Sequence, residues 1–210
     1  EPRGTIKVSL PVSIAQNEMA KILPDFLKKY PEIKVQMMIT NRRVDIINEG
    51  FDLALRVRTS LDDDPNLVIR QFEKIEQHLF ASQGYLNEFG DLKTPEQLSE
   101  HKILSMAEEH TEQFLILQNE QQQQKKIRIN PTVMGSDLNM LAQLAASSCG
   151  ITLLPDNVVQ QYIERGELVR VLSDWKTAHG IFHLVYPSRR GLLPAVRVFI
   201  DYLVEHLHLV

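Results

Sequence analysis

The chain has 210 residues, of which 43% are apolar and 24% are charged, so it can bury a sizeable hydrophobic core. This length suits two small lobes better than one compact domain. The formal net charge of −4 argues against direct contact with DNA, because DNA-binding domains usually present a basic face. No apolar run approaches the ~18 residues of a membrane span, and we expect no membrane partner.

The first part of the chain alternates between strand and helix patterns. Residues 5–10 alternate apolar and polar side chains, as a half-buried strand does. Ser13 and Gln16 form a capping box that predicts the start of a helix, and apolar positions then recur every three or four residues up to Tyr30. Pro24 lies inside this helix and should bend it or loosen one turn. The patterns that follow predict a strand at 33–39, a short helix capped by Thr40 or Asn41 and closed by Gly50, and strands at 52–57 and 67–72.

A second unit is predicted from residue 75 onward. Its expected elements are a strand at 75–82, a capping box at 94–97, a strand at 103–106, a hairpin with strands at 114–117 and 127–129, a strand at 132–135, a helix capped by Ser136 or Asp137, a strand at 150–154, a helix at 156–165 ended by Gly166, and a strand at 168–172. The hairpin tip, residues 118–126, contains a Gln-rich run that we interpret as a solvated loop. Nothing in the sequence assigns that tip a further role.

The end of the chain is expected to return to the first lobe. A strand at 181–186 is followed by a helix that starts at Pro194. We therefore expect residues 1–74 and 182–210 to form lobe I and residues 75–181 to form lobe II, inserted between them. The predicted fold class is α/β, with two Rossmann-like lobes that have mixed sheets and are joined by two crossover segments. Two crossings make a hinged clamp, with a ligand cleft expected between the lobes.

The sequence contains no recognisable catalytic set. No P-loop, GxGxxG, GxSxG or CxxC motif occurs. His179 and His183 stand four apart, but on a strand-like segment they would not converge on one metal ion, so ordinary surface or packing histidines are favoured. Glu108 and Glu109 fit a solvated loop better than an acid–base pair. We expect no catalytic residue, no metal and no cofactor, and we predict that the chain is not an enzyme.

Cys149 is the single cysteine, so the chain cannot form an intrachain disulfide. This fits a reducing compartment and a cytoplasmic location. Its apolar neighbours favour a small buried side chain over a reactive thiol. The chain begins with Glu1 rather than Met, and we expect it to be part of a longer protein.

Binding chemistry is better supported, at the turns between strands and helices. Ligands of open α/β sheets bind beyond the carboxyl ends of strands, where helix N-termini offer unpaired N–H groups. The residues expected to contact a ligand lie in three such turns and on the third strand: Ser9, Leu10, Pro11, Val12, Ser13, Thr40, Asn41, Gly135, Ser136, Asp137 and Arg56. Plain helix capping explains the Ser, Thr and Asp residues equally well, although a cap can also line a pocket.

Two charged side chains bear on the charge of the ligand. Arg56, near the carboxyl end of the third strand, could bind an anion through both of its outer nitrogens. Arg58 is an alternative, and either arginine could be a surface charge. Asp137 would repel an anion unless it is paired, so the ligand need not be acidic.

The same segments resemble the effector-binding domain of LysR-type transcriptional regulators. In chain order, the matching segments are 8–13 (VSLPVS), 23–27 (LPDFL) with 30–31 (YP), 49–56 (EGFDLALR), 80–82 (FAS), 85–86 (YL), 150–155 (GITLLP), 185–190 (VYPSRR) and 199–203 (FIDYL). Each segment alone is weak evidence, whereas the ordered set covers nearly the whole chain. Residues 108–112 and 114–126 match no pattern of the family.

The resemblance implies a periplasmic-binding-protein-like pair of lobes with a small organic effector between them. It also implies a homodimer or homotetramer, and contact with DNA only through an N-terminal winged helix-turn-helix domain that is missing here. By position, the resemblance assigns to the cleft Ser9, Pro11, Val12, Ser13, Thr40, Arg56, Ser136 and Asp137. The effector, the target genes and the choice between activation and repression do not follow from it.

Three functions compete at this point. A sensing domain should expose an apolar stripe for self-association, which the helix at 13–30 could supply. A periplasmic solute-binding protein shares the two-lobed architecture but should be monomeric. An enzyme should show a nucleophile with a base, or a metal set. We favour the sensing domain, in which effector binding shifts the lobe angle and with it the geometry of the dimer.

Overall fold

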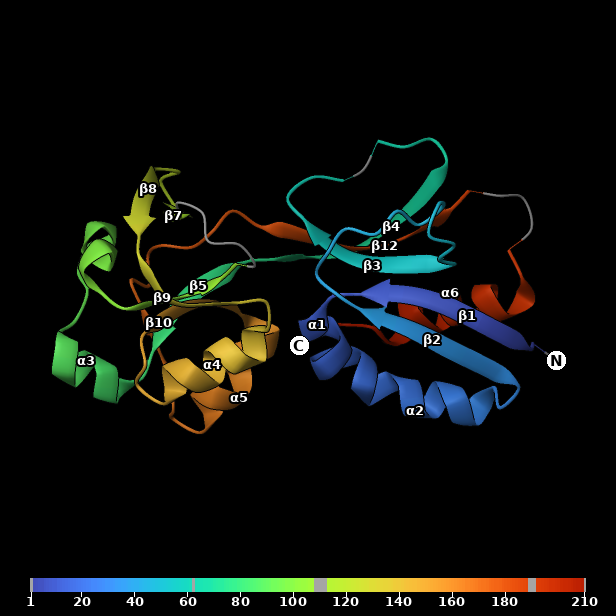
Figure 1. Ribbon diagram of the computed structural model, residues 1–210, viewed down its shortest axis with the longest axis horizontal. Helices are drawn as coiled ribbons and strands as arrows, with labels where there is room; N and C mark the ends of the chain where they lie inside the picture. The colour runs from blue at the N-terminus through green and yellow to red at the C-terminus, as the bar shows by residue number, and fades with distance from the viewer. Residues whose placement is uncertain (1, 62, 108–112, 189–191, 210) are drawn as a thin grey trace. The chain divides into compact units, whose positions relative to one another are not determined.

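The computed structural model describes residues 2–61, 63–107, 113–188 and 192–209 (Figure 1). The chain divides into two compact units. Unit 1 comprises Glu1–Ile75 and Gly180–Val210, and unit 2 comprises Glu76–His179. The boundaries expected from the sequence, at 74/75 and 181/182, lie one and two residues from these positions.

The strands of unit 1 form a mixed sheet in the order β2-β1-β3-β12-β4. The strands are β1 (Gly4–Leu10), β2 (Ile33–Ile39), β3 (Leu53–Arg58), β4 (Leu67–Ile75) and β12 (Gly180–Pro187). β1 is parallel to β2 and to β3, whereas β12 is antiparallel to both of its neighbours. The carboxyl ends of β1, β2 and β3 therefore lie at the same edge of the sheet.

The two faces of this sheet are covered differently. Buried side chains of β1, β3 and β12 pack with α2 (Ala20–Lys29) and α6 (Pro194–His206), so the helices cover one face. Leu53 and Leu55 point to this face, whereas the intervening Ala54 packs with Val44 and Phe51 of the loop at 40–52. The loop therefore covers part of the opposite face, as the alternation of side chains along a strand requires.

Aromatic rings hold α2 to α6. The Phe26 ring is fully buried, and its centroid lies 5.0 Å from that of Tyr30, 4.8 Å from that of Phe199 and 5.1 Å from that of Tyr202. The Tyr202 hydroxyl donates to the Ile22 carbonyl at 2.8 Å, which satisfies the polar end of a largely buried ring. The Tyr202 pKa is raised by burial and, to a smaller extent, by Asp25 and Glu205.

The helix expected at 41–50 does not form. The segment consists of turns, because its side chains bond to nearby backbone N–H groups. Asp45 Oδ1 accepts the N–H of Asn48 at 3.0 Å, and Glu49 Oε1 accepts the N–H of Asp45 at 2.9 Å. Such local bonds compete with a helical ladder. Gly50, at φ 69°, ends these turns in a left-handed conformation.

The first helix also starts differently from the prediction. Pro11, not Ser13, is the N-cap of α1 (Val12–Ile14), so the expected capping box of Ser13 and Gln16 is wrong. A π-helical turn, η1 (Ala15–Met19), leads into α2. Pro24 lies in α2 without ending it.

The strands of unit 2 form a second mixed sheet in the order β11-β5-β10-β6-β9. They are β5 (Gln77–Ala81), β6 (Ile103–Met106), β9 (Pro131–Gly135), β10 (Ile151–Pro155) and β11 (Val169–Val171). α4 (Leu138–Ala146) and α5 (Asp156–Glu164) pack on one face (Figure 1). The other face packs with α3 (Gln83–Phe89), the 3₁₀ helix η2 (Pro95–Glu100) and a hairpin. These two mixed sheets confirm the predicted α/β fold class.

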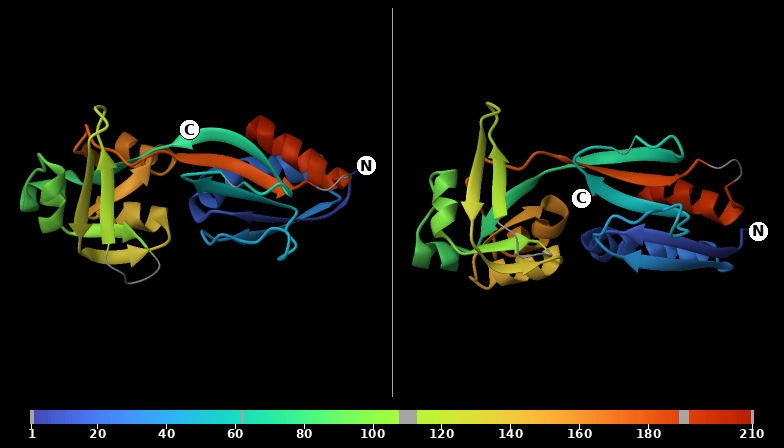
Figure 2. Two further views of the ribbon diagram at one scale, coloured as in Figure 1. Left: turned by 90° about the horizontal axis from the view of Figure 1, so that it is seen from above. Right: turned by 45° about the horizontal axis from the view of Figure 1, so that its top comes forward.

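The hairpin expected around the Gln-rich run is confirmed. It consists of β7 (Gln113–Gln118) and β8 (Gln124–Ile129), which form a narrow ribbon (Figure 2). Leu117, Ile127 and Ile129 are buried against the sheet. Gln118 and Lys176 exchange backbone hydrogen bonds of 2.8 and 3.0 Å, so β7 is also tied to the segment that follows β11.

Close backbone packing in unit 2 makes Gly150→Ala a test of the fold. A Cβ on Gly150 would lie 2.5 Å from the Lys102 carbonyl oxygen, so β10 would have to move away from β6. We expect a loss of about 1–3 kcal/mol in the free energy of unfolding, because overpacked sites cost this much. Thermal denaturation measures it. Gly135→Ala is the control, since its Cβ would meet nothing closer than Leu141 at 4.0 Å. Equal melting temperatures for the two variants would contradict the prediction.

Candidate functional site

The strand-to-helix edge of unit 1 brings two of the predicted turns together. Leu10 ends β1, and its carbonyl accepts the N–H of Thr40, the first residue after β2, at 2.9 Å. Asn41 Oδ1 accepts the N–H of Val12 at 3.2 Å. The helix start is therefore capped by a residue 29 positions away in the sequence. This cap fixes Pro11–Val12 against Thr40–Asn41.

The groups available at this edge differ from residue to residue. The Ser13 hydroxyl, in the first turn of α1, forms no hydrogen bond with any residue that the structure describes. Thr40 Oγ1 accepts the N–H of Arg42 at 3.1 Å. Ser9 is only 3% exposed and lies within the sheet, in register with Met38 and Ala54. Ser13 is more exposed than Ser9 and, unlike Thr40, forms no hydrogen bond with a described residue, so its hydroxyl is the most available to a ligand.

Arg56 lies on the sheet face that the loop at 40–52 covers. Its side chain is 5% exposed, and Nη2 donates to the Val44 carbonyl at 2.8 Å. It lines a pocket of about 250 Å³ together with residues of that loop, of the segment before β4 and of the start of β4: Arg43, Val44, Asp45, Ile46, Ile47, Asp64 and Leu67. The guanidinium thus contributes to the packing of the loop, in addition to any role in binding.

An ion pair organises the same loop. Arg42 Nη1 and Nη2 donate to the two carboxylate oxygens of Glu49, at 3.0 and 2.8 Å. The hydrogen bond from Arg42, together with the N–H of Asp45, lowers the pKa of Glu49 to about 2. The loop that carries Thr40 and Asn41 is therefore held by a paired carboxylate at neutral pH.

In unit 2, the predicted turn follows β9. Gly135 ends the strand, and its carbonyl accepts the N–H of Ala107 at 3.2 Å. Asp137 Oδ1 accepts the N–H groups of Asn139 and Met140 at 2.9 and 3.2 Å, so Asp137 is confirmed as the N-cap of α4. Ser136, between them, is partly buried.

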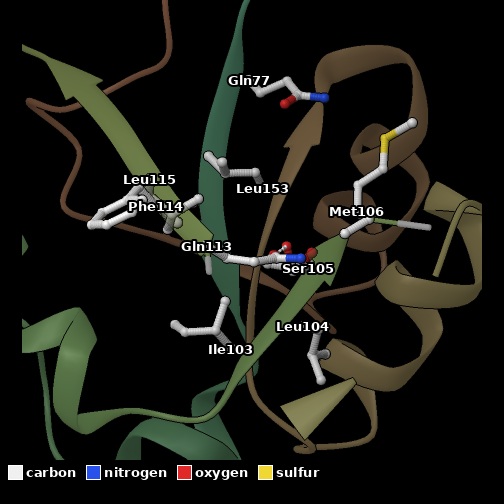
Figure 3. A pocket seen from close by; sticks show the side chains of 12 residues that line it. Gln77, Ile103, Leu104, Ser105, Met106, Gln113, Phe114, Leu115 and Leu153 are labelled. Carbon is white, nitrogen blue, oxygen red and sulfur yellow. Dashed lines mark hydrogen bonds between the residues drawn. The ribbon is translucent and has the colours of Figure 1, made fainter. Parts of the chain in front are cut away.

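A pocket that the sequence analysis did not find lies within unit 2 (Figure 3). It has a volume of about 400 Å³. The described residues that line it come from β5, β6, β7 and β10 and from the position after β6: Gln77, Leu79, Ile103, Leu104, Ser105, Met106, Ala107, Gln113, Phe114, Leu115, Thr152 and Leu153. Ser105 and Gln113 are polar positions in otherwise apolar strands, and this is the signal that the sequence offered.

The residues considered for catalysis or metal binding do not assemble. His183 is buried, with Nδ1 2.9 Å from the Ile181 carbonyl oxygen, and His179 precedes β12. Within the described ranges, no group of three or more His, Cys, Asp or Glu side chains could hold a metal ion. Glu108 and Glu109 lie outside the described residues, and Cys149 is partly buried. No helix in the described part of the chain is both long and apolar enough to cross a bilayer.

Two mixed sheets with helices packed on them define an α/β domain whose strand-to-helix turns gather at one edge, the place where ligands of open α/β sheets bind. The family model of the LysR substrate binding domain matches residues 1–208. The chain belongs to this family of substrate-binding domains.

Curated relatives carry the same regulator description. An HTH-type transcriptional regulator of Xanthomonas campestris pv. campestris is 29% identical over 210 residues, covering 99% of this chain and 60% of the relative. The HTH-type transcriptional regulator CrgA of Neisseria meningitidis serogroup C is 28% identical, covering 98% of this chain and 68% of its own length. The chain thus spans about three fifths of the length of the first of these relatives.

Solved structures with the same fold are also regulators. The full-length AphB N100E variant superimposes with a TM-score of 0.87 at 28% identity, over all of this chain and 70% of that chain. The CrgA regulatory domain from Neisseria meningitidis superimposes with a TM-score of 0.83 at 27% identity, over 99% of this chain and 100% of that chain. The periplasmic-binding-protein-like fold expected from the resemblance is thereby confirmed.

The Arg42–Glu49 pair can be tested through the titration of Glu49. Arg42→Ala should raise the pKa of Glu49 from about 2 toward the usual 4.5, because it removes the largest cause of the shift. The folded-state pKa is lowered, so the pairing is complete above about pH 4.5 and is lost as the pH falls through about 2. Carboxyl carbon NMR titration measures both values. Lys28→Ala removes a cation elsewhere in unit 1 and serves as control. A Glu49 pKa that stays near 2 in Arg42→Ala would contradict this account.

Proposed function

We propose that this chain is the effector-sensing domain of a LysR-type transcriptional regulator. The observation that carries the proposal is the preformed edge of unit 1, where Asn41 caps the first helix and the Ser13 hydroxyl is left without a partner among the described residues. A small organic effector would bind there through hydrogen bonds. Membership of the substrate-binding domain family supports this role.

The predicted binding residues remain part of this proposal. In unit 1 they are Ser9, Leu10, Pro11, Val12, Ser13, Thr40, Asn41 and Arg56, and in unit 2 they are Gly135, Ser136 and Asp137. Asp137 already caps α4, and Arg56 already donates to Val44. The Asp137 carboxylate would repel an anion, and the Arg56 guanidinium is already engaged with Val44, so the effector need not be an anion.

The signalling mechanism follows from a difference in affinity. An effector that binds one arrangement of the domain better than another shifts the population toward it by that difference. In this proposal, a separate N-terminal domain of the regulator contacts the DNA. The regulator acts in the cytoplasm. The relatives' description as transcriptional regulators favours this function over a solute-binding protein or an enzyme.

Self-association is also part of the proposal, with a second copy of the chain as partner. Most of the apolar stripe on the first helix is packed within unit 1, and Leu27 is its exposed member at 40%. More exposed apolar side chains lie on β2, which is an edge strand: Met37, Met38 and Ile39 are 39%, 40% and 50% exposed, with Met38 on the opposite face of the strand from the other two. An edge strand with exposed apolar side chains is a ready pairing surface.

A ligand screen followed by substitution tests the effector site. A thermal-shift screen of aromatic acids, aldehydes and quinones should yield a compound that stabilises the chain by about 2.7 kcal/mol at one hundred times its Kd. Ser13→Ala and Ser136→Ala should lower the affinity of the chain for that compound. They should also lower the induction of a reporter by the full-length protein. Ser99→Ala on η2 is the control. Unchanged binding and induction in both site variants would contradict the proposed site.

The regulator role has a separate test in the gene. If the gene encodes no helix-turn-helix region upstream of Glu1, the proposal that the chain belongs to a transcriptional regulator is wrong.

The association surface is tested by sedimentation equilibrium. Ile39→Glu should convert a dimer into a monomer, because it buries an unpaired carboxylate at the interface. Ile163→Glu on α5 changes a side chain of similar exposure, 43%, and should leave the dimer intact. If the unmodified chain is monomeric at high concentration, or if both variants stay dimeric, β2 is not the interface.

A further inference from the structure

We infer that the pocket of unit 2 between the central sheet and β7 binds a small, uncharged and largely apolar molecule with one hydrogen-bonding group. The site is separate from the strand-to-helix edge of unit 1, since all of its lining residues belong to unit 2. The inference does not depend on the regulator role, because binding is measured on the chain alone.

The pocket is built from regular structure. Leu79 on β5, Ile103 on β6 and Leu153 on β10 form its floor on the face of the sheet that packs with the hairpin. Leu115 of β7 forms the wall above that floor (Figure 3). A volume of about 400 Å³ lies within the range of roughly 300–1,000 Å³ that small-molecule sites occupy. Rigid strands keep such a pocket formed in the absence of a ligand.

One polar pair lies at the centre of the apolar walls. Figure 3 shows Gln113 pointing toward Ser105, and the Ser105 hydroxyl donates to Gln113 Oε1 at 2.6 Å. Among the described residues, the partner of Gln113 Nε2 is a thioether, Met134 Sδ at 3.5 Å. The oxygen of Ser105 and the amide nitrogen of Gln113 thus keep capacity for a ligand. A single hydroxyl or carbonyl oxygen on an apolar body would match this arrangement.

The charge of the ligand follows from the lining. None of the described lining residues is ionisable. An ionised ligand would lose its hydration without gaining a counter-ion from the described lining, which is costly in an apolar site. A neutral molecule loses little on entry, and its hydrogen bond to Ser105 or Gln113 offsets that loss.

The rim also points to an occupant. Met106 is apolar, yet it is 47% exposed. It lines the pocket, so a bound molecule would remove its surface from water. The unbranched Met106 side chain can adapt to ligands of different shape. Exposed apolar side chains around a concave apolar site are typical of binding pockets.

Calorimetric titration with a matched pair of probes tests the inference. The 210-residue chain is titrated with 1-naphthol, which is uncharged at pH 7, and with 1-naphthoate, its anionic counterpart. We expect one-to-one binding of 1-naphthol, and binding of 1-naphthoate at least about ten-fold weaker. Leu153→Trp should abolish 1-naphthol binding by filling the pocket. Gln113→Met keeps the side-chain size and should weaken binding roughly two- to ten-fold, as the loss of one hydrogen bond predicts.

The control is Ile116→Ala on the same strand. Ile116 is 55% exposed and does not line the pocket, so binding should not change. Circular dichroism checks that each variant is folded, and Gln113→Met remains informative if Leu153→Trp does not fold. The inference is overturned if 1-naphthol does not bind up to its solubility limit or if 1-naphthoate binds as tightly. It is also overturned if folded Leu153→Trp and Gln113→Met bind like the unmodified chain. Any of these results would leave the proposed regulator function standing.

Discussion

The returning strand β12 is the constraint on which the rest of the structure depends. It lies between β3 and β4 and is paired along both sides, from Gly180 to Pro187 with β4. Phe182 and Leu184 on this strand are fully buried in the core of unit 1. Unit 1 cannot complete its sheet until a segment more than one hundred residues downstream of β4 has returned, and closing such a loop costs entropy. Unit 2 is consequently anchored at both of its ends. Ile75 pairs with Gly180 in unit 1, and Gln77 and Thr177 exchange hydrogen bonds in unit 2.

The edge of unit 1 shows how a parallel sheet brings together turns that are distant in the sequence. Because β1, β2 and β3 run parallel, the residues that follow β1 and β2 meet at one edge. Asn41 uses this proximity to cap the helix at Val12, so a helix start that would otherwise need a local cap receives a distant one. The Ser13 hydroxyl forms no hydrogen bond with the described residues. The loop at 40–52 is held by the Arg42–Glu49 ion pair and by the hydrogen bond from Arg56 to the Val44 carbonyl. A residue such as Arg56 can thus serve stability and lie close to a site at once.

The predictions from sequence succeeded where one local signal dominated. Asp137 caps α4, Gly166 follows α5 with a left-handed φ of 69°, and the Gln-rich run turns a hairpin. They failed where other side chains, from the same loop or from a distant one, formed the hydrogen bonds to the backbone that the prediction had assigned differently. The residues at 41–50 carry a plausible helix pattern, but Asp45 and Glu49 bond to backbone N–H groups and hold turns instead. The predicted Ser13–Gln16 capping box does not form, because the helix begins two residues earlier. Pro11 is its N-cap, and Asn41 from another loop accepts the N–H of Val12.

The sequence by itself determined the α/β class, the order of most elements, the return of the chain to its first unit and the family. These properties are written in short-range periodicity, turn residues and ordered motifs, which need no knowledge of distant contacts. Only the tertiary structure decided which side chains share a surface. The pocket of unit 2 joins Gln77, Ser105, Gln113 and Leu153 from separate strands, and no spacing in the sequence predicts that meeting. Strand order and hairpin packing set it, because burial of apolar faces selects which strands become neighbours.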